Sequence, residues 1–142
     1  MMQSKQTGLT LVELMVVVAV MAIIAAVAYP LYTNQVQKTR RADAKIALES
    51  IAMAQERFYT INGEYAASLS SLQVSADIQG GASEQGYYNL AVVRAGADNE
   101  QFTATATASG TGPQADDTNC AQFTINQQGV KTATDGGSTN CW

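Results

Sequence analysis

The hydrophobic pattern is dominated by one long apolar run near the N-terminus. No polar residue occurs between Leu14 and Ala28, and three apolar residues in front of them extend the run. The total reaches roughly the 20 residues that a helix needs to cross a bilayer. Glu13 is the one charge inside the run. We therefore predict an apolar, membrane-spanning helix over residues 9–35.

A helix of a different kind is predicted directly after this run. Over residues 36–59 the apolar positions are mostly three, four or seven apart, with charged residues between them. The apolar positions are Val36, Ala44, Ala47, Leu48, Ile51 and Phe58, and the charged ones include Lys38, Arg40, Arg41, Lys45, Glu49 and Glu56. Asn62-Gly63 supplies a helix stop. This amphipathic stretch is expected to lie on a globular head domain, residues 36–142.

In the rest of the head, the sequence pattern predicts a loop followed by an antiparallel sheet. Residues 64–86 are polar and rich in Ser, Ala and Gly, as in a connecting loop. Residues 87–94, 101–108 and 122–126 are β-rich, and residues 101–107 alternate as a half-buried antiparallel strand does. A turn is expected at 96–99, and a short fourth strand is compatible with residues 130–132. The predicted class is α+β: one long N-terminal helix on an antiparallel sheet of three or four strands.

Composition narrows the possible functions. The chain has 142 residues, the size of one domain, and 8 Lys and Arg face 12 Asp and Glu, a balance that argues against nucleic acid as the main partner. There is no histidine, the commonest general base and transition-metal ligand. With no visible triad, metal set or phosphate loop, we expect no enzyme, no catalytic residues, no cofactor and no metal.

Two cysteines, Cys120 and Cys141, lie in a Thr-, Ser-, Gln- and Ala-rich region. They suggest one disulfide, which implies an oxidising compartment. A closed loop of roughly twenty residues contributes about 3 kcal/mol to stability. The alternative is two free thiols, and a Cys pair without histidine is a poor zinc site.

The position of Gly8 relative to the apolar run distinguishes two kinds of cleavable leader. A cleavable secretory signal has its small-residue cut site after the apolar stretch, whereas Gly8 stands before it. The apolar run would therefore survive a cut at Gly8. A Sec signal peptide and a plain membrane anchor are the alternatives. Glu13 would cost on the order of 2.5–3.5 kcal/mol unpaired in a membrane, so it needs a partner or a purpose.

The run Gly8-Leu9-Thr10-Leu11-Val12-Glu13-Leu14-Met15, the Val/Ala/Ile stretch and Ala28-Tyr29-Pro30 resemble the class III leader junction of type IV pilins and pseudopilins. The resemblance implies that residues 1–8 are a leader, cut between Gly8 and Leu9 by the prepilin peptidase, which also methylates Leu9. The family more often has Phe at this position.

The same resemblance gives roles to two further residues. Glu13 would act in assembly by approaching the Leu9 ammonium of an adjoining subunit; a hydrated or protonated carboxylate is the alternative. Pro30 removes a helix N–H and crowds the carbonyl of Ala26, so a kink or local melting is expected there. Pro30 would be either a flexible joint of the rod or the end of the membrane span.

Two downstream stretches resemble PilE-type minor pilins of the type IVa class, namely residues 55–66 and residues 120–129 together with the Asn140-Cys141-Trp142 terminus. The spacing of Cys120 and Cys141 also matches the C-terminal disulfide loop of type IVa pilins. The resemblance implies a structural subunit that helps to prime or build a type IV pilus and so serves twitching motility, adhesion or DNA uptake. The alternatives are a major type IV pilin and a type II secretion pseudopilin. The commoner signature of a pseudopilin is an acidic calcium site. Asp116-Asp117 is the only acidic pair, and we interpret it as part of a solvated loop and not as a cation site.

The implied partners are major and minor pilin subunits, bound through residues 9–35, the prepilin peptidase and the inner-membrane assembly platform. The implied location is the inner membrane, single-pass with a periplasmic head, and afterwards the extracellular pilus. The cluster Lys38, Arg40, Arg41 and Lys45 could be a DNA-binding module. Because it lacks interleaved aromatic residues and contains Asp43, we interpret it as a solvated or subunit-contacting helix face and do not expect nucleic acid as a direct partner.

Overall fold

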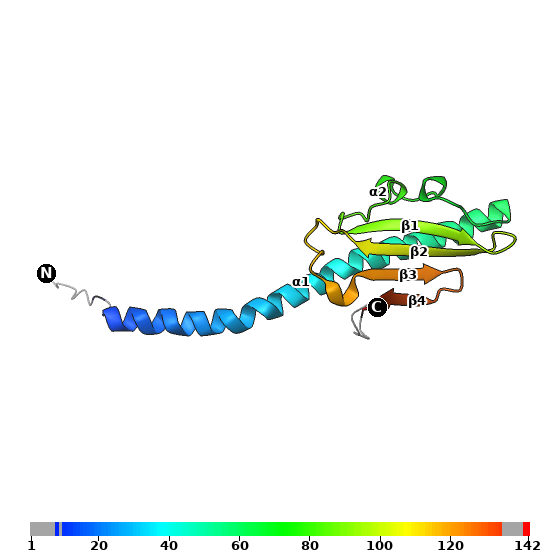
Figure 1. Cartoon of the computed structure of the whole chain (residues 1–142). Helices are drawn as coiled ribbons and strands as arrows, with labels where there is room; N and C mark the ends of the chain where they lie inside the picture. Colours follow the sequence, from blue (N-terminus) through cyan, green and yellow to red (C-terminus); the bar gives the residue numbers. More distant parts are fainter. Residues whose placement is uncertain (1–7, 9, 135–140) are drawn as a thin grey trace. The chain divides into compact units, whose positions relative to one another are not determined.

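The computed structural model describes Gly8, residues 10–134 and residues 141–142. Helix α1 covers Leu11–Asn62 and is followed by two short helices, η1 (Leu69–Ser71) and α2 (Ala76–Gln79). Strands β1 (Tyr88–Ala95), β2 (Gln101–Ala108), β3 (Gln122–Asn126) and β4 (Lys131–Thr134) follow, with η2 (Thr118–Cys120) between β2 and β3 (Figure 1). The chain forms two units that meet between Val36 and Gln37, and each is described by itself.

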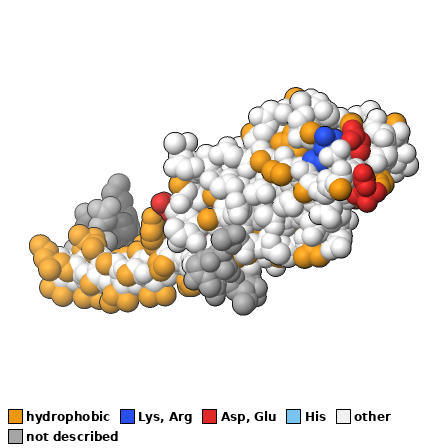
Figure 2. Space-filling view, turned by 45° about the vertical axis from the view of Figure 1, so that its right-hand side comes forward, with side chains coloured by type: hydrophobic (Ala, Val, Ile, Leu, Met, Phe, Trp, Pro, Cys, Tyr) orange, Lys and Arg blue, Asp and Glu red, His pale blue; other side chains and the backbone are white. Residues whose placement is uncertain are grey.

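The first unit contains the apolar part of α1. Its large side chains are exposed, for example Val16 at 57% and Ile23 at 68%. Figure 2 shows hydrophobic side chains covering the visible side of this segment. The helix is long and apolar enough to cross a membrane. Nothing within the unit covers this surface in the part of the chain that the structure describes.

Pro30 lies inside α1, and the backbone stays helical on both sides of it. The Thr33 hydroxyl donates a hydrogen bond of 3.0 Å to the Pro30 carbonyl. The local melting expected at Pro30 is therefore not seen, and the kink stays a prediction.

In the second unit, α1 buries one face. The buried side chains are Arg41, Ala44, Ala47, Leu48, Ile51, Ala54 and Gln55. The amphipathic pattern is confirmed for the four central apolar positions, whereas Val36 and Phe58 are only partly buried. The predicted stop is confirmed too: Gly63 has a φ of 74°, and its N–H donates to the Tyr59 carbonyl at 2.8 Å.

The four strands form one antiparallel sheet in the order β1-β2-β3-β4. In β2, Phe102, Ala104 and Ala106 are buried, and the threonines between them lie on the other face. The inner face joins α1 in one apolar cluster that includes Leu48, Ile51, Tyr88, Phe102 and Phe123. The predicted α+β fold is confirmed, including the fourth strand, which runs over Lys131–Thr134.

The loop predicted over residues 64–86 contains regular structure that the sequence pattern did not indicate. It forms η1 and α2, and it buries Leu69, Leu72 and Ile78 against the core. Helices of three or four residues are too short to show a helical hydrophobic period, which explains why they were not predicted.

Candidate assembly and interaction sites

Glu13 lies in the first turn of α1, where Thr10 caps the helix. The Glu13 N–H donates to Thr10 Oγ1 at 3.2 Å, and the Thr10 hydroxyl donates to Glu13 Oε2 at 3.5 Å. The Thr-x-x-Glu spacing is that of a capping box, but the Glu13 carboxylate meets the Thr10 hydroxyl and not the Thr10 backbone N–H. Glu13 also places a negative charge near the positive end of the helix dipole. The carboxylate therefore has a local partner in the single chain. The sequence prediction omitted Thr10, although the spacing signals a cap.

The cleavage junction is only partly described. Gly8 is exposed, and a Cβ built on it would meet no atom within 4 Å. Leu9 lies outside the described residues. Cleavage after Gly8 and methylation of Leu9 therefore stay predictions.

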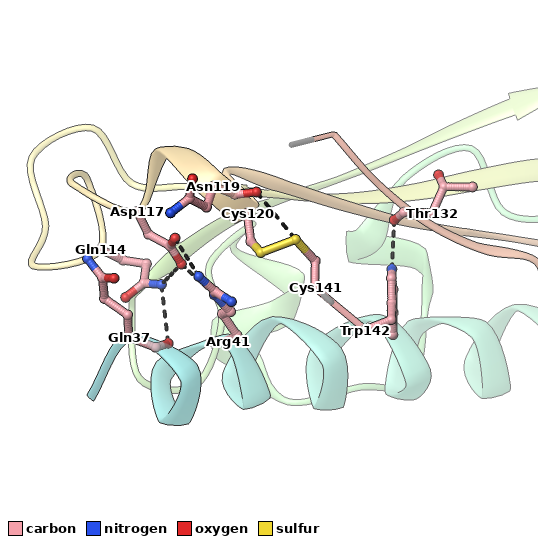
Figure 3. Close-up of a disulfide and its surroundings, with 9 residues drawn as sticks. All are labelled: Gln37, Arg41, Gln114, Asp117, Asn119, Cys120, Thr132, Cys141 and Trp142. Atoms are coloured by element: carbon pink, nitrogen blue, oxygen red, sulfur yellow. Dashed lines mark hydrogen bonds and ion pairs between the residues drawn. A yellow bond between two sulfur atoms is a disulfide. The ribbon is translucent and has the colours of Figure 1, made fainter. Parts of the chain in front are cut away.

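A buried ion pair joins α1 to the segment before β3. Arg41 donates from Nε to Asp117 Oδ2 at 2.6 Å and from Nη2 to Oδ1 at 2.7 Å. Gln114 donates to the same carboxylate at 2.6 Å, and Asp117 is only 1% exposed (Figure 3). The hydrogen bond to Asp117 raises the pKa of Arg41 above its ordinary value.

This pair corrects two sequence interpretations. Arg41 is not part of a solvated helix face, because its guanidinium is buried against Asp117. Asp117 is likewise not in a solvated acidic pair. Its carboxylate is occupied by Arg41, and no group of three or more acidic, Cys or His side chains that could hold a metal ion occurs among the described residues. The two partners are 76 positions apart in the chain, so no local pattern could reveal them.

Cys120 and Cys141 form a disulfide, as predicted (Figure 3). It places the C-terminal Trp142 beside the sheet, where the indole Nε1 donates to the Thr132 carbonyl at 2.7 Å. The Trp142 ring also meets the buried Phe123 ring edge-on, with centroids 5.6 Å apart. From the sequence, Trp142 was noted only as part of the terminus that resembles PilE-type minor pilins.

Two other cations of the basic cluster, Arg40 and Lys45, lie beside aromatic rings, and so does Lys131 on β4. The Arg40 guanidinium lies 5.4 Å from the Tyr87 ring centre, while Lys45 and Lys131 lie 5.9 Å and 4.9 Å from the Trp142 ring centre. Partial burial and the neighbouring charges of Arg41 and Lys131 lower the pKa of Lys45. The aromatic rings that the basic cluster itself lacks are thus supplied by Tyr87, next to β1, and by the C-terminal Trp142, a proximity that the sequence could not show.

Two family models match the chain. One, described as the type IV minor pilin ComP, a DNA uptake sequence receptor, matches residues 30–124. The other, described as the prokaryotic N-terminal methylation motif, matches residues 3–29. The fimbrial protein EcpC of Eikenella corrodens is 31% identical over 110 residues, which are 78% of this chain and 69% of that protein.

Solved structures show the same architecture. A type IV pilin from Shewanella oneidensis is 29% identical, with a TM-score of 0.51, over 75% of this chain and 97% of that one. The non-core minor pilin PilV of Neisseria meningitidis is 18% identical, with a TM-score of 0.52, over 74% of this chain and 93% of that one. The second likeness shows the fold alone.

Proposed function

The chain belongs to the type IV minor pilins, and from this premise we propose that it is cut between Gly8 and Leu9, methylated on Leu9 and assembled through the apolar part of α1. It is an inner-membrane pilin before assembly and a component of an extracellular pilus afterwards. Its family and fold are those of structural subunits. A PilE-like role in priming assembly, and so in twitching motility, adhesion or DNA uptake, is the finer form of the proposal.

The observation that carries this proposal is the uncovered apolar surface of α1 before Val36. A helix that is apolar on all sides is stable in lipid, where its backbone groups are satisfied internally. The same surface gains about 25 cal/mol per Å² when it is buried against other helices. Packing among subunits can therefore offset the loss of the membrane environment when a subunit enters a filament.

Glu13 would add specificity to this packing. In the single chain its carboxylate is held by the Thr10 cap. Moving it into a bundle of apolar helices is costly unless a positive group meets it, and the methylated Leu9 amine of a neighbouring subunit is such a group. The attraction arises only at the correct axial offset between subunits, so the pair would select register more than it adds raw stability.

The test compares Glu13→Gln with wild type in cells that make pili. Glutamine keeps the shape and removes the charge, so the leader should still be cut while the amount of subunit in sheared pili falls several-fold. Glu84→Gln, which removes an exposed charge from the head, is the matched control and should assemble normally. Equal incorporation of the Glu13→Gln and wild-type subunits would refute the charge-dependent role.

Direct contact with DNA is a second candidate function, although the composition argues against it. It is favoured by the cation–aromatic contacts around Trp142, since basic side chains beside aromatic rings are what nucleic-acid surfaces use. The matching family model is also that of a DNA uptake sequence receptor, although its match ends at residue 124, before Lys131 and Trp142.

This candidate predicts salt-dependent binding of a duplex. Replacing Lys45 and Lys131 together by Gln should lower the slope of log affinity against log salt by up to about 2, close to 1 for each phosphate that the protein no longer neutralises. Lys38→Gln is the control for an exposed cation away from the aromatic rings. No binding at low salt, or equal slopes for all three proteins, would reject this surface.

A further inference from the structure

Strand β1 lies at one edge of the sheet, and the chain before it pairs only with its first half (Figure 1). The Leu90 N–H donates to the Gly81 carbonyl at 2.7 Å, so the backbone groups of Leu90 point away from β2. In an antiparallel strand this direction alternates from one residue to the next. The backbone groups of Val92 and Arg94 therefore also point away from β2.

The second half of β1 is an open edge. Among the described residues, the backbone N–H and C=O groups of Val92 and Arg94 have no hydrogen-bond partner on that side. Burial follows the same division, because Leu90 beside Gly81 is only 7% exposed, whereas Val92 and Arg94 are partly exposed. These two residues thus present the groups that an added strand needs.

The outer face of this half is apolar. Ala91, Val93 and Ala95 lie on it and are exposed, Val93 at 62%. On β2 and β3 the same face carries mostly threonine, with glutamine and asparagine. The one charged side chain within residues 91–95 is Arg94, which lies on the inner face and forms an ion pair of 3.1 Å with Glu64. The exposed strip therefore lacks the charges and prolines that commonly protect an edge strand.

We propose that the head binds a second copy of itself by pairing the two β1 edges as antiparallel strands, with a two-fold axis at Val93. The two open residues are two positions apart, so the axis places Val92 of each copy opposite Arg94 of the other. Both pairs can then exchange backbone hydrogen bonds. On the outer face, the two Val93 side chains meet, and Ala91 of each copy meets Ala95 of the other. The edge and its apolar strip are thus self-complementary.

Neighbouring registers are less favourable. An axis at Val92 would place Arg94 opposite Leu90, whose N–H is already bonded to Gly81. An axis at Arg94 would place two like charges directly opposite each other. Gly96, with a φ of 91°, turns the chain away from the strand at the point where the Gly81 segment of the other copy begins. The pairing is short, so the expected dimer is weak; because a two-fold pair is closed, it joins two subunits without extending a filament.

Cysteine cross-linking tests this register in the full chain, in detergent with micelles in excess. Val93→Cys places two thiols on the axis, where the facing Cβ atoms lie about 4.5 Å apart, close enough for a disulfide. Ala91→Cys is the matched control, because it is exposed on the same strand but faces Ala95 of the other copy. Mild oxidation is followed by non-reducing electrophoresis over a range of protein concentrations.

We expect several-fold more covalent dimer from Val93→Cys than from Ala91→Cys or Ala95→Cys alone. A mixture of Ala91→Cys and Ala95→Cys should cross-link as well as Val93→Cys does. Equal cross-linking of Val93→Cys and Ala91→Cys, each by itself, would overturn the proposal. So would a mixture that gives no more dimer than its two components.

A second variant tests whether backbone pairing holds the dimer together. Val92→Pro removes the outward N–H, while the hydrogen bonds between β1 and β2 do not use that group. Added to Val93→Cys, it should lower the yield of covalent dimer several-fold. Unchanged cross-linking in a double variant with a wild-type circular dichroism spectrum would refute strand pairing. If the double variant does not fold, the comparison of Val93→Cys with Ala91→Cys decides.

Discussion

The parts of α1 before and after Val36 share one backbone geometry but differ in where their apolar side chains find partners. Before Val36 the helix is apolar all round, and its large side chains are exposed in the single chain. After it, one face packs on the sheet, with Leu48 and Ile51 fully buried. A sequence can therefore form a helix without supplying a partner for the surface of that helix. In the head the sheet covers one face of α1, whereas the apolar segment needs lipid or other subunits to cover it.

The largest effect is expected where the head depends on a buried charge. Arg41→Leu leaves the Asp117 carboxylate buried without its partner, so the free energy of unfolding of the head should fall by about 3–5 kcal/mol. Lys38→Gln, which removes an exposed cation, should change it by less than about 0.5 kcal/mol. Denaturant unfolding of the full chain in detergent, followed by circular dichroism, measures both.

A double variant sharpens this prediction. Replacing Arg41 and Asp117 together by apolar residues of similar size removes both charges, and most of the lost stability should return. A double variant as unstable as Arg41→Leu would show that the pair is needed for its shape and hydrogen bonds and not for charge compensation.

Matched truncations on the two parts of α1 should differ strongly. Leu48→Ala opens a cavity in the core and should destabilise the head by about 2–5 kcal/mol. Val18→Ala removes methyl groups that are exposed in the single chain, so unfolding of the head should not change, while the yield of assembled pili should fall. If Val18→Ala destabilised the head as much as Leu48→Ala does, the separation between the two units would be wrong.

Removing the disulfide tests the C-terminal half of the head. With Cys120 and Cys141 both replaced by Ser, the head should lose about 3 kcal/mol, the closure free energy of a loop of roughly twenty residues. The apolar segment should still insert into the inner membrane. Unchanged unfolding in the double serine variant would contradict a stabilising role for the bond.

The smallest effect is a pH dependence confined to the head. Burial raises the pKa of Tyr88 to about 12 from an ordinary value of 10.0. Because the pKa is higher in the folded state, the associated stability is complete below about pH 10 and is lost as pH rises through about 12. Thermal melts from pH 9 to 12 should show a steeper decline for wild type than for Tyr88→Phe. Curves of equal slope for the two proteins would show that the loss of stability at alkaline pH does not come from Tyr88.

How much the sequence revealed follows the same division. The helix of the apolar segment could be predicted from the sequence, because an apolar run of about 20 residues is itself the signal of a membrane-spanning helix. Strands β2 and β3 were predicted with their observed bounds, because alternation is a local signal. The Arg41–Asp117 pair and the position of Trp142 could not be predicted, because they depend on tertiary contacts between distant positions. Arg41 and Asp117 were wrongly interpreted as solvated because the buried partner of each lies 76 positions away in the chain.

Intact-mass measurement of the subunit recovered from sheared pili tests the central claim most directly. The expected protein begins at Leu9, carries one methyl group on its amine and has Cys120 and Cys141 oxidised. Gly8→Val, which places a branched side chain at the scissile bond, should leave uncut precursor in the inner membrane and none in the pili. A filament subunit that began at Met1 or after Ala28, or a Gly8→Val variant that assembled normally, would contradict the account.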